Sequence, residues 1–346
     1  MPCPLRLVAA TAALVALVAC TDGVEPGAGA TRPATPTPPR TVDAEPPETA
    51  SPERPHPVSL PALFDIEPDG RAFRVRRELG RTDAYVRYFI TYRSGDLTIS
   101  GLMNVPLGEG PFPVIVLNHG YIDPEVYLTG RGFERTQEYL PRRGFAIVHI
   151  DYRNHAGSDD DPRNDVRLRL GYTEDAINAV DAIRRSRLPY LDRERIGMLG
   201  RSMGGGVTLN VAVVRPDLVD AMVVFSSVSS DTVDNFNRWI RRRRPIAREI
   251  LERFDSPAEA PEFWRGVSPR TYFDRVEVPI LMHHGTADST TPFRWALETN
   301  RALRRQGADV TFYRYRGEEH AFSPAAFARA MDRTVTFFRH HLAAER

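Results

Sequence analysis

The sequence contains no lysine: all 46 of its basic residues are arginine. Mechanisms in which a lysine side chain takes part, such as Ser-Lys dyads, are therefore excluded. Only two of the 346 residues are cysteines, Cys3 and Cys20, and Cys3 falls in a segment that we expect to be removed on export, which leaves no pair to oxidise. The formal net charge of +1, with 26% charged residues, gives no general attraction to nucleic acid.

Long apolar runs are also missing, apart from a short stretch at the amino terminus. Arg6 precedes an apolar segment over residues 7–19, which is too short and too poorly flanked to span a bilayer permanently. It ends in Leu-Val-Ala-Cys, which resembles the lipobox of bacterial lipoproteins. The resemblance implies that residues 1–20 are a lipoprotein signal peptide and that Cys20 is lipidated. The protein would then be exported and anchored at the extracytoplasmic face of the cell membrane. A plain secretory signal with an incidental cysteine is the alternative.

Residues 21–57 have the composition of a linker. Ten of these 37 positions are proline, and most of the others are Thr, Ala, Glu or Gly. Such a segment cannot bury enough apolar surface to offset the entropy of ordering, so we expect it to be disordered and partly extended. The remaining residues, 58–346, are enough for one large α/β domain and leave no room for a second domain of comparable size.

The expected domain alternates strands and helices. Residues 85–93 and 97–105 alternate in polarity around Ser-Gly-Asp and predict an antiparallel hairpin. Apolar periodicity predicts a helix after a Thr173 cap and another over residues 325–338. Continuous apolar strands separated by helices indicate a mostly parallel, doubly wound sheet. Those strands are expected at 114–117, 145–150, 196–199, 221–225, 280–283 and 310–315.

The pentapeptide Gly-Arg-Ser-Met-Gly at 200–204 is the most informative motif. An apolar strand precedes it, and residues 207–214 can continue it as a helix. A strand, G-x-S-x-G and a helix form a nucleophile elbow, a sharp turn that exposes the serine hydroxyl at the edge of the sheet. Gly200 and Gly204 are needed because the strand and the helix leave the turn so close together that a Cβ would clash. Ser202 is therefore the candidate nucleophile.

Two later loops provide the partners that a serine nucleophile requires. Asp288 and His320 each follow an apolar strand-like run, and the order Ser, Asp, His is that of the α/β-hydrolases. His320 would take the proton of Ser202, and Asp288 would fix the tautomer of the imidazole. Glu318 and Glu319 are rivals for the acid by proximity, but residues so close to the histidine are poorly placed to reach its Nδ1.

At these residues the chain resembles the catalytic domain of the prolyl oligopeptidase family of serine hydrolases. The likeness runs from about residue 92 to 341 and implies an α/β-hydrolase fold and an esterase or peptidase that works through an acyl-enzyme. Peptidases of that family carry a β-propeller that gates the site, and we expect none here. The motifs that carry the likeness are Asp151-Tyr152-Arg153, the approach to the elbow over 190–197, Ser268-Pro269, and the Asp288 and His320 loops.

An acyl-transfer site needs two N–H donors for the developing oxyanion. One is expected to be the backbone N–H of Met203, at the start of the helix after the elbow. The other is assigned by the resemblance to Tyr121, either through its backbone N–H or through its phenol. We interpret His119, in the same turn, as a structural histidine that braces the turn rather than as a base.

The segment of about 226–275 is expected to form a small cap insertion over the site. Its aromatic residues could shape the substrate pocket or simply pack the cap onto the body. The run at 238–244, which contains five arginines, is either a solvated face or a contact for anionic lipid headgroups. His283 and His284 are neighbours on one strand and point to opposite faces, so we expect no metal site. The cap aromatics are Phe236, Trp239, Phe254, Phe263 and Trp264.

The sequence thus predicts a serine hydrolase that needs no cofactor and acts on small or medium carboxylic esters. A prolyl oligopeptidase-like peptidase or aminopeptidase is the alternative. A non-catalytic surface lipoprotein that only binds is the third possibility, but it would predict a broken triad, and all three members are present. The sequence does not indicate an oligomeric state.

Overall fold

The computed structural model describes residues 54–343, which form one compact unit. The expected signal peptide with Cys20, and the linker up to residue 53, lie outside the described residues. Across the described part of the chain, no helix combines the length and the apolarity that crossing a bilayer requires.

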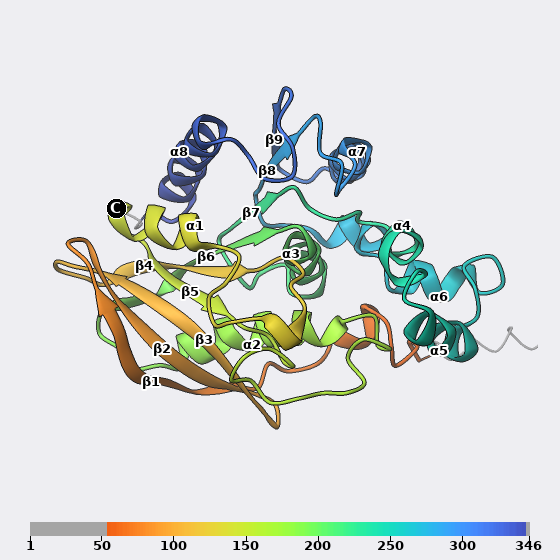
Figure 1. Cartoon of the computed structure of the whole chain (residues 1–346), viewed down its shortest axis with the longest axis horizontal. Coiled ribbons are helices and arrows are strands. Elements are labelled where there is room, and N and C mark those ends of the chain that lie inside the picture. Colours follow the sequence, from red (N-terminus) through yellow and green to blue (C-terminus); the bar gives the residue numbers. More distant parts are fainter. Residues whose placement is uncertain (1–53, 344–346) are drawn as a thin grey trace, which may run out of the picture. The chain divides into compact units, whose positions relative to one another are not determined.

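A nine-stranded sheet forms the centre of this unit, in the order β1-β2-β3-β5-β4-β6-β7-β8-β9 (Figure 1). The first three strands and β5 pair antiparallel, and all pairs from β5 to β9 are parallel. The predicted mostly parallel sheet is confirmed, as is the hairpin of β2 and β3. The strands are β1 (Gly70–Arg81), β2 (Tyr85–Ser94), β3 (Leu97–Pro106), β4 (Phe112–Asn118), β5 (Ala146–Ile150), β6 (Leu191–Arg201), β7 (Ala221–Phe225), β8 (Ile280–Gly285) and β9 (Val310–Tyr315).

Helices cover both faces of the sheet. Helices α2, α3 and α7 pack on one face, and α1 and α8 pack on the other (Figure 1). Their bounds are α1 (Glu134–Tyr139), α2 (Leu170–Arg184), α3 (Met203–Val214), α7 (Phe293–Arg305) and α8 (Pro324–His341).

Strand β4 shows why the central strands read as continuous apolar runs. Val114 and Val116 enter the core beneath α2 and α3, whereas Ile115 and Leu117 enter the core beneath α8. All four side chains are fully buried. A strand that is covered on both faces needs apolar residues at successive positions, as expected for the interior of a parallel sheet. The predicted α/β-hydrolase architecture is thereby confirmed.

Two local expectations were wrong, and one strand was missed. The long edge strand β1 was not predicted from the sequence. Thr173 does not cap a helix, because α2 already begins at Leu170, with Arg169 before it. The folded unit also begins before residue 58: the ring of His56 lies edge-on to Phe254 and Phe263, with centroids 5.5 and 5.0 Å away.

The insertion between β7 and β8 is helical, and most of its aromatic residues pack within it. Phe236 and Trp264 are buried against each other, with ring centroids 4.8 Å apart, and Phe254 stacks on Phe263 at 4.4 Å. These four side chains therefore hold the cap together. The insertion contains α4 (Thr232–Asn235), the π-helical turn η4 (Phe236–Ile240), α5 (Arg244–Phe254), α6 (Pro261–Gly266) and η5 (Pro269–Arg275).

Candidate active site

Ser202 lies on the turn between β6 and α3, in a backbone conformation that few residues adopt. Its φ of 57° and ψ of −122° correspond to a strained geometry that costs about 1–3 kcal/mol and is typical of functional sites. A Cβ on Gly200 would lie 2.1 Å from the carbonyl oxygen of Gly204, and a Cβ on Gly204 would lie 1.8 Å from that of Asn118. Both glycines of the motif are therefore required by close backbone approach.

Backbone hydrogen bonds hold this turn in place. The N–H of Ser202 donates to the carbonyl of Phe225 at the end of β7 (3.0 Å), and its own carbonyl accepts from Gly205 and Gly206 in α3 and from Val228. The neighbouring strand and the helix thus compensate the strain at Ser202. As the first residue of α3, Met203 has an N–H without an intrahelical acceptor, which can face an anion.

The turn after β4 runs beside the elbow. Strands β4 and β6 pair Asn118 with Gly200, so the next residues of both strands leave the sheet together. A Cβ on Gly120 would lie 3.1 Å from Cβ of Ser202 and 3.7 Å from its hydroxyl oxygen, which places the Tyr121 turn against the nucleophile. The Tyr121 side chain is 45% exposed. Its ring lies 4.8 and 5.7 Å from two guanidinium groups, those of Arg169 and Arg243.

The structure brings Asp288 and His320 together. Nδ1 of His320 lies 2.8 Å from Oδ2 of Asp288. The other carboxylate oxygen, Oδ1, accepts from the backbone N–H groups of Thr290 (2.9 Å) and Thr291 (2.8 Å), and the Thr291 hydroxyl donates to Oδ2 (2.8 Å). Asp288 is buried, whereas His320 is partly exposed. The acid is therefore fixed on both sides, and the imidazole can still meet a substrate.

The ionisation of Asp288 determines the tautomer of the imidazole. Burial acts to raise the pKa of Asp288, but the hydrogen bond and charge of His320, together with the donors of Thr291, lower it to about 2. The carboxylate is thus ionised near neutral pH and can only accept. Nδ1 of His320 must then carry the proton, which leaves Nε2 as the acceptor that a general base needs.

Among residues 54–343, no hydrogen bond joins Ser202 to His320, but their two loops are connected. Arg201, which precedes the nucleophile, donates from Nη2 to the carbonyl oxygen of His320 (3.2 Å) and so ties the two loops together. Among residues 54–343, the side-chain hydrogen bonds of His320 all involve Nδ1. Nε2 is therefore free to accept from Ser202, and such bonds commonly tighten only when substrate is present.

His119 has a structural environment. It is fully buried, with Nδ1 2.7 Å from the carbonyl oxygen of Gly120 and Nε2 3.2 Å from that of Asp151. Burial lowers the pKa of His119 to about 3, so the ring stays neutral and can donate its one N–H to only one of these two carbonyl oxygens. Full burial and this hydrogen bond to the backbone fit a residue that braces the Gly120 turn rather than a base.

The other titratable candidates have separate partners. His283 contacts the hydroxyl groups of Tyr315 and Thr334, whereas His284 lies on the opposite face of β8, against the carbonyl of Thr291. In residues 54–343, no three His, Cys, Asp or Glu side chains are grouped so that they could hold a metal ion. Glu318 accepts from the backbone N–H and hydroxyl of Ser323, and Glu319 accepts from those of Ser289, so both are engaged in loop contacts away from the imidazole.

A cavity of about 170 Å³ opens beside His320. Its lining comes from the start of α1 and the loop before it, the ends of β6 and β7, the loop that carries His320, and α8, and it includes Arg201, Phe225, Ser226 and Phe322. None of the cap aromatics lines it. Sequence reasoning missed this group because its members are far apart in the chain; the only hint was Arg201, inside the elbow motif itself.

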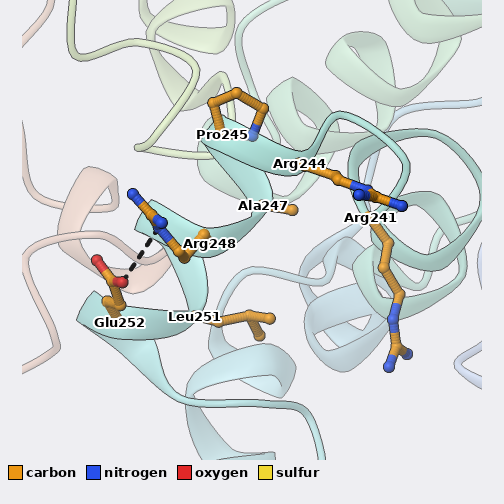
Figure 2. A pocket seen from close by; sticks show the side chains of 7 residues that line it. All are labelled: Arg241, Arg244, Pro245, Ala247, Arg248, Leu251 and Glu252. Atoms are coloured by element: carbon orange, nitrogen blue, oxygen red, sulfur yellow. Dashed lines mark ion pairs between the residues drawn. The ribbon is translucent and has the colours of Figure 1, made fainter.

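The arginine run lies on the cap. Arg241 and Arg244, with Pro245 and Leu251, line a hollow of about 670 Å³ along α5 that contains none of the triad residues (Figure 2). Arg248, on the same helix, forms an ion pair with Glu252 at 3.4 Å. Arg243 turns away toward the body, where it lies 3.8 Å from Asp165. Within the run, Arg241 and Arg244 therefore line the hollow on the cap, whereas Arg243 lies near Asp165 and the ring of Tyr121.

Comparison with known proteins places this chain in a family. A sequence model of the prolyl oligopeptidase family matches residues 131–345. The chain is 28% identical over 250 residues to the uncharacterized peptidase YuxL of Bacillus subtilis, which covers 68% of this chain and 35% of that protein. It is 29% identical over 228 residues to human acyl-coenzyme A thioesterase 1, with coverage of 59% and 48%. The chain thus spans less than half of the length of these curated relatives.

The fold is similar to that of solved hydrolases. Acetyl xylan esterase 1 from Thermoanaerobacterium sp. superposes with a TM-score of 0.61 at 18% sequence identity, covering 84% of this chain and 95% of that one. At this identity the similarity establishes the shared fold.

Proposed function

Because the chain belongs to the prolyl oligopeptidase family, we propose that it is a serine hydrolase that cleaves carboxylic esters through an acyl-enzyme. The observation that carries the proposal is the hydrogen bond of 2.8 Å between His320 Nδ1 and Asp288 Oδ2, on loops beside a serine in an elbow conformation. This arrangement supports Ser202 as nucleophile, His320 as base and Asp288 as the acid that orients it.

The proposed reaction proceeds in two stages. Ser202 Oγ attacks the ester carbonyl carbon while His320 Nε2 takes the hydroxyl proton, and the negative charge develops on the carbonyl oxygen. The N–H of Met203 and the backbone N–H of Tyr121 stabilise that charge, and each donor is worth a few kcal/mol of barrier. His320 then returns the proton to the leaving alcohol as the acyl–oxygen bond breaks. Water, activated by the same imidazole, releases the acid from Ser202.

The positive charge beside the proposed base favours esters over peptides that bind through a free amino terminus. The cavity at His320 is lined by two arginines, Arg135 and Arg201, against the single carboxylate of Glu134. Such a surface repels the ammonium group that an aminopeptidase must hold. Cleavage of thioesters and acetyl esters, named for the thioesterase and the xylan esterase above, agrees with this preference. A serine peptidase is the second candidate, favoured by the peptidase name of the Bacillus relative.

Labelling and a substrate comparison test this proposal. A fluorophosphonate probe should label the chain once, and Ser202→Ala should abolish the label; labelling that survives the substitution removes the triad from consideration. Specificity constants for short acyl p-nitrophenyl esters should exceed those for aminoacyl and prolyl p-nitroanilides. If the anilides gave the larger specificity constants, a serine peptidase would become the favoured function.

We also propose export and lipid anchoring at Cys20, with the hydrolase domain carried on the proline-rich segment outside the cytoplasm. The support is the Leu-Val-Ala-Cys tetrapeptide after an apolar stretch. In the native host, Cys20→Ala should leave the precursor uncleaved and unlabelled by radioactive palmitate. A wild-type protein that is wholly soluble and unacylated would contradict the anchor and leave the hydrolase proposal untouched.

A further inference from the structure

The cavity beside His320 has an excess of positive charge that the catalytic steps do not use. Arg201 and Arg135 line it, with Glu134 as the one acidic residue of the wall. The Glu134 carboxylate already accepts a hydrogen bond from the backbone N–H of Gly132 (3.0 Å). The wall therefore has a net charge of about +1 when His320 is neutral, and its guanidinium groups face a space large enough for a small substituent.

Neither arginine forms an ion pair with a carboxylate of residues 54–343, and Arg201 is the one next to the nucleophile. Its Nη2 donates to the carbonyl oxygen of His320, but no carboxylate of residues 54–343 forms an ion pair with it within 4 Å. Its other guanidinium N–H groups have no partner in the described part of the chain and are not sealed from solvent. A guanidinium carries five donors, so the tether to His320 leaves most of this capacity unused.

Arg153 shows how this chain treats a guanidinium that serves structure alone. It is 4% exposed and pairs with Asp161, Glu174 and Asp175 at 2.9–3.1 Å. Burial opposes its charge, but these carboxylates raise the pKa of Arg153 above its usual range. Burial lowers the pKa of Arg201, and the charges of Asp288 and Glu134, which form no ion pair with it, offset this only in part. Arg201 thus lacks the carboxylate that completes a buried arginine, at a position next to the nucleophile.

The second arginine is held at the rim of the cavity. The guanidinium of Arg135 lies over the ring of Phe327, 3.7 Å from its centroid, and donates to the carbonyl of Phe322. These contacts fix Arg135 in the cavity lining, where it can meet a polar ligand together with Arg201.

We propose that this cavity binds a carboxylate carried by the leaving group of the substrate, with Arg201 as the principal contact and Arg135 as the second. The inference rests on the proposed function. The lining of the cavity indicates that it receives the leaving group rather than the acyl group. It includes His320, which protonates the departing oxygen, and it includes neither of the proposed oxyanion donors, Met203 and Tyr121. As the acyl–oxygen bond breaks, the proton passes from His320 to an alcohol that keeps its negative carboxylate, and the acyl group stays on Ser202.

Matched substrates with one acyl group test this proposal. The substrates are the acetyl esters of 3- and 4-hydroxybenzoate and of their neutral methyl benzoate counterparts, with p-nitrophenyl hemisuccinate as an ester charged on the acyl side. The readout is the ratio of kcat/KM for the charged to the neutral leaving group, which cancels losses common to both. Arg201→Met should lower this ratio by about 10- to 100-fold, and Arg135→Met by a smaller factor.

Arg131→Met is the matched control. Arg131 is an exposed residue of the loop before α1, four positions before Arg135; its guanidinium donates to the carbonyl of Val126, and it does not line the cavity. It removes the same formal charge, so its ratio should stay within about twofold of the wild type. In parallel, benzoate should inhibit competitively more strongly than benzamide, and Arg201→Met should remove this difference.

The possible results separate the carboxylate-binding inference from the hydrolase proposal. A wild-type ratio that shows no preference for the carboxylate, or that is unaffected by Arg201→Met, overturns the inference, while Ser202-dependent cleavage of the neutral esters keeps the hydrolase proposal. Arginine-dependent preference for the hemisuccinate instead places the anion on the acyl side and also overturns it. Failure to cleave any ester refutes both.

Discussion

Replacing Asp288 by asparagine tests the catalytic geometry most directly, because the structure determines how the new side chain must lie. Oδ1 of Asp288 accepts from the N–H groups of Thr290 and Thr291, so the amide oxygen of an asparagine must occupy that position. The amide NH₂ then faces His320 where Oδ2 stood. Since an NH₂ group only donates, Nδ1 of His320 has to accept, and its proton moves to Nε2.

The wrong tautomer abolishes the base without unfolding the protein. With a proton on Nε2, His320 cannot take the Ser202 proton, and turnover should fall about 10⁴-fold, which corresponds to about 5.5 kcal/mol of barrier. The pKa of Asp288, lowered to about 2 from 3.8, limits the lost charge stabilisation to about 2.5 kcal/mol near neutral pH. The Thr291 hydroxyl can turn to the carbonyl of Ser226, which it already contacts at 3.1 Å. A destabilisation of this size leaves a typical domain folded, so the fall in turnover would report catalysis rather than unfolding.

The assay is single-turnover and steady-state hydrolysis of p-nitrophenyl acetate, with urea unfolding of the same preparations. Glu318→Gln and Glu319→Gln serve as controls, because their carboxylates bond to Ser323 and Ser289 and should change turnover by less than about tenfold. An Asp288→Asn variant that keeps more than about a tenth of wild-type turnover, or a glutamate variant that falls as far, would refute the assignment of the acid.

Three further changes have defined outcomes. Gly204→Ala should abolish fluorophosphonate labelling, because its Cβ would lie 1.8 Å from the carbonyl oxygen of Asn118. Burial lowers the pKa of His283 to about 3 in the folded protein, whereas in the unfolded chain it is near 6.5, so the free energy of unfolding decreases as the pH falls from about 6.5 toward 3. In urea unfolding between pH 6 and 4, His283→Gln should reduce this decrease by about 1.4 kcal/mol per pH unit. Asp175→Asn should lower the unfolding free energy by about 3 kcal/mol in urea, because Arg153 loses its fully buried partner.

The parallel strands and the elbow were predictable because each is encoded locally. A strand buried on both faces, such as β7, is a run of apolar residues, and the turn at Ser202 requires glycine two residues before and after it. Strand β1 gave no such signal. It carries five arginines over Gly70–Arg81, and only Phe73 and Val75 supply partly buried apolar side chains. Charged side chains on an edge strand prevent it from pairing with other molecules. They also interrupt the alternation of apolar and polar residues by which a strand is recognised in the sequence.

The candidate triad was predictable for the same reason, since each member follows an apolar strand. The contacts around it were not. Thr291, which touches both the acid and the imidazole, has no motif of its own, and Arg201 gains its meaning only from its distance to the carbonyl of His320. The aromatic residues of the cap were equally compatible with a pocket or a core, and only their mutual packing showed that four of them, Phe236 among them, form a core.

The pairing of Asn118 with Gly200 bears on the geometry of the proposed oxyanion hole. Tyr121 and Met203 each follow these paired residues by three positions. If both donate through the backbone, as proposed above, the ladder between β4 and β6 sets the spacing of the two N–H groups, and no side chain has to hold them. Substitutions that change the substrate contacts around the site would then leave the two donors in register, provided that positions 200 and 204 keep glycine.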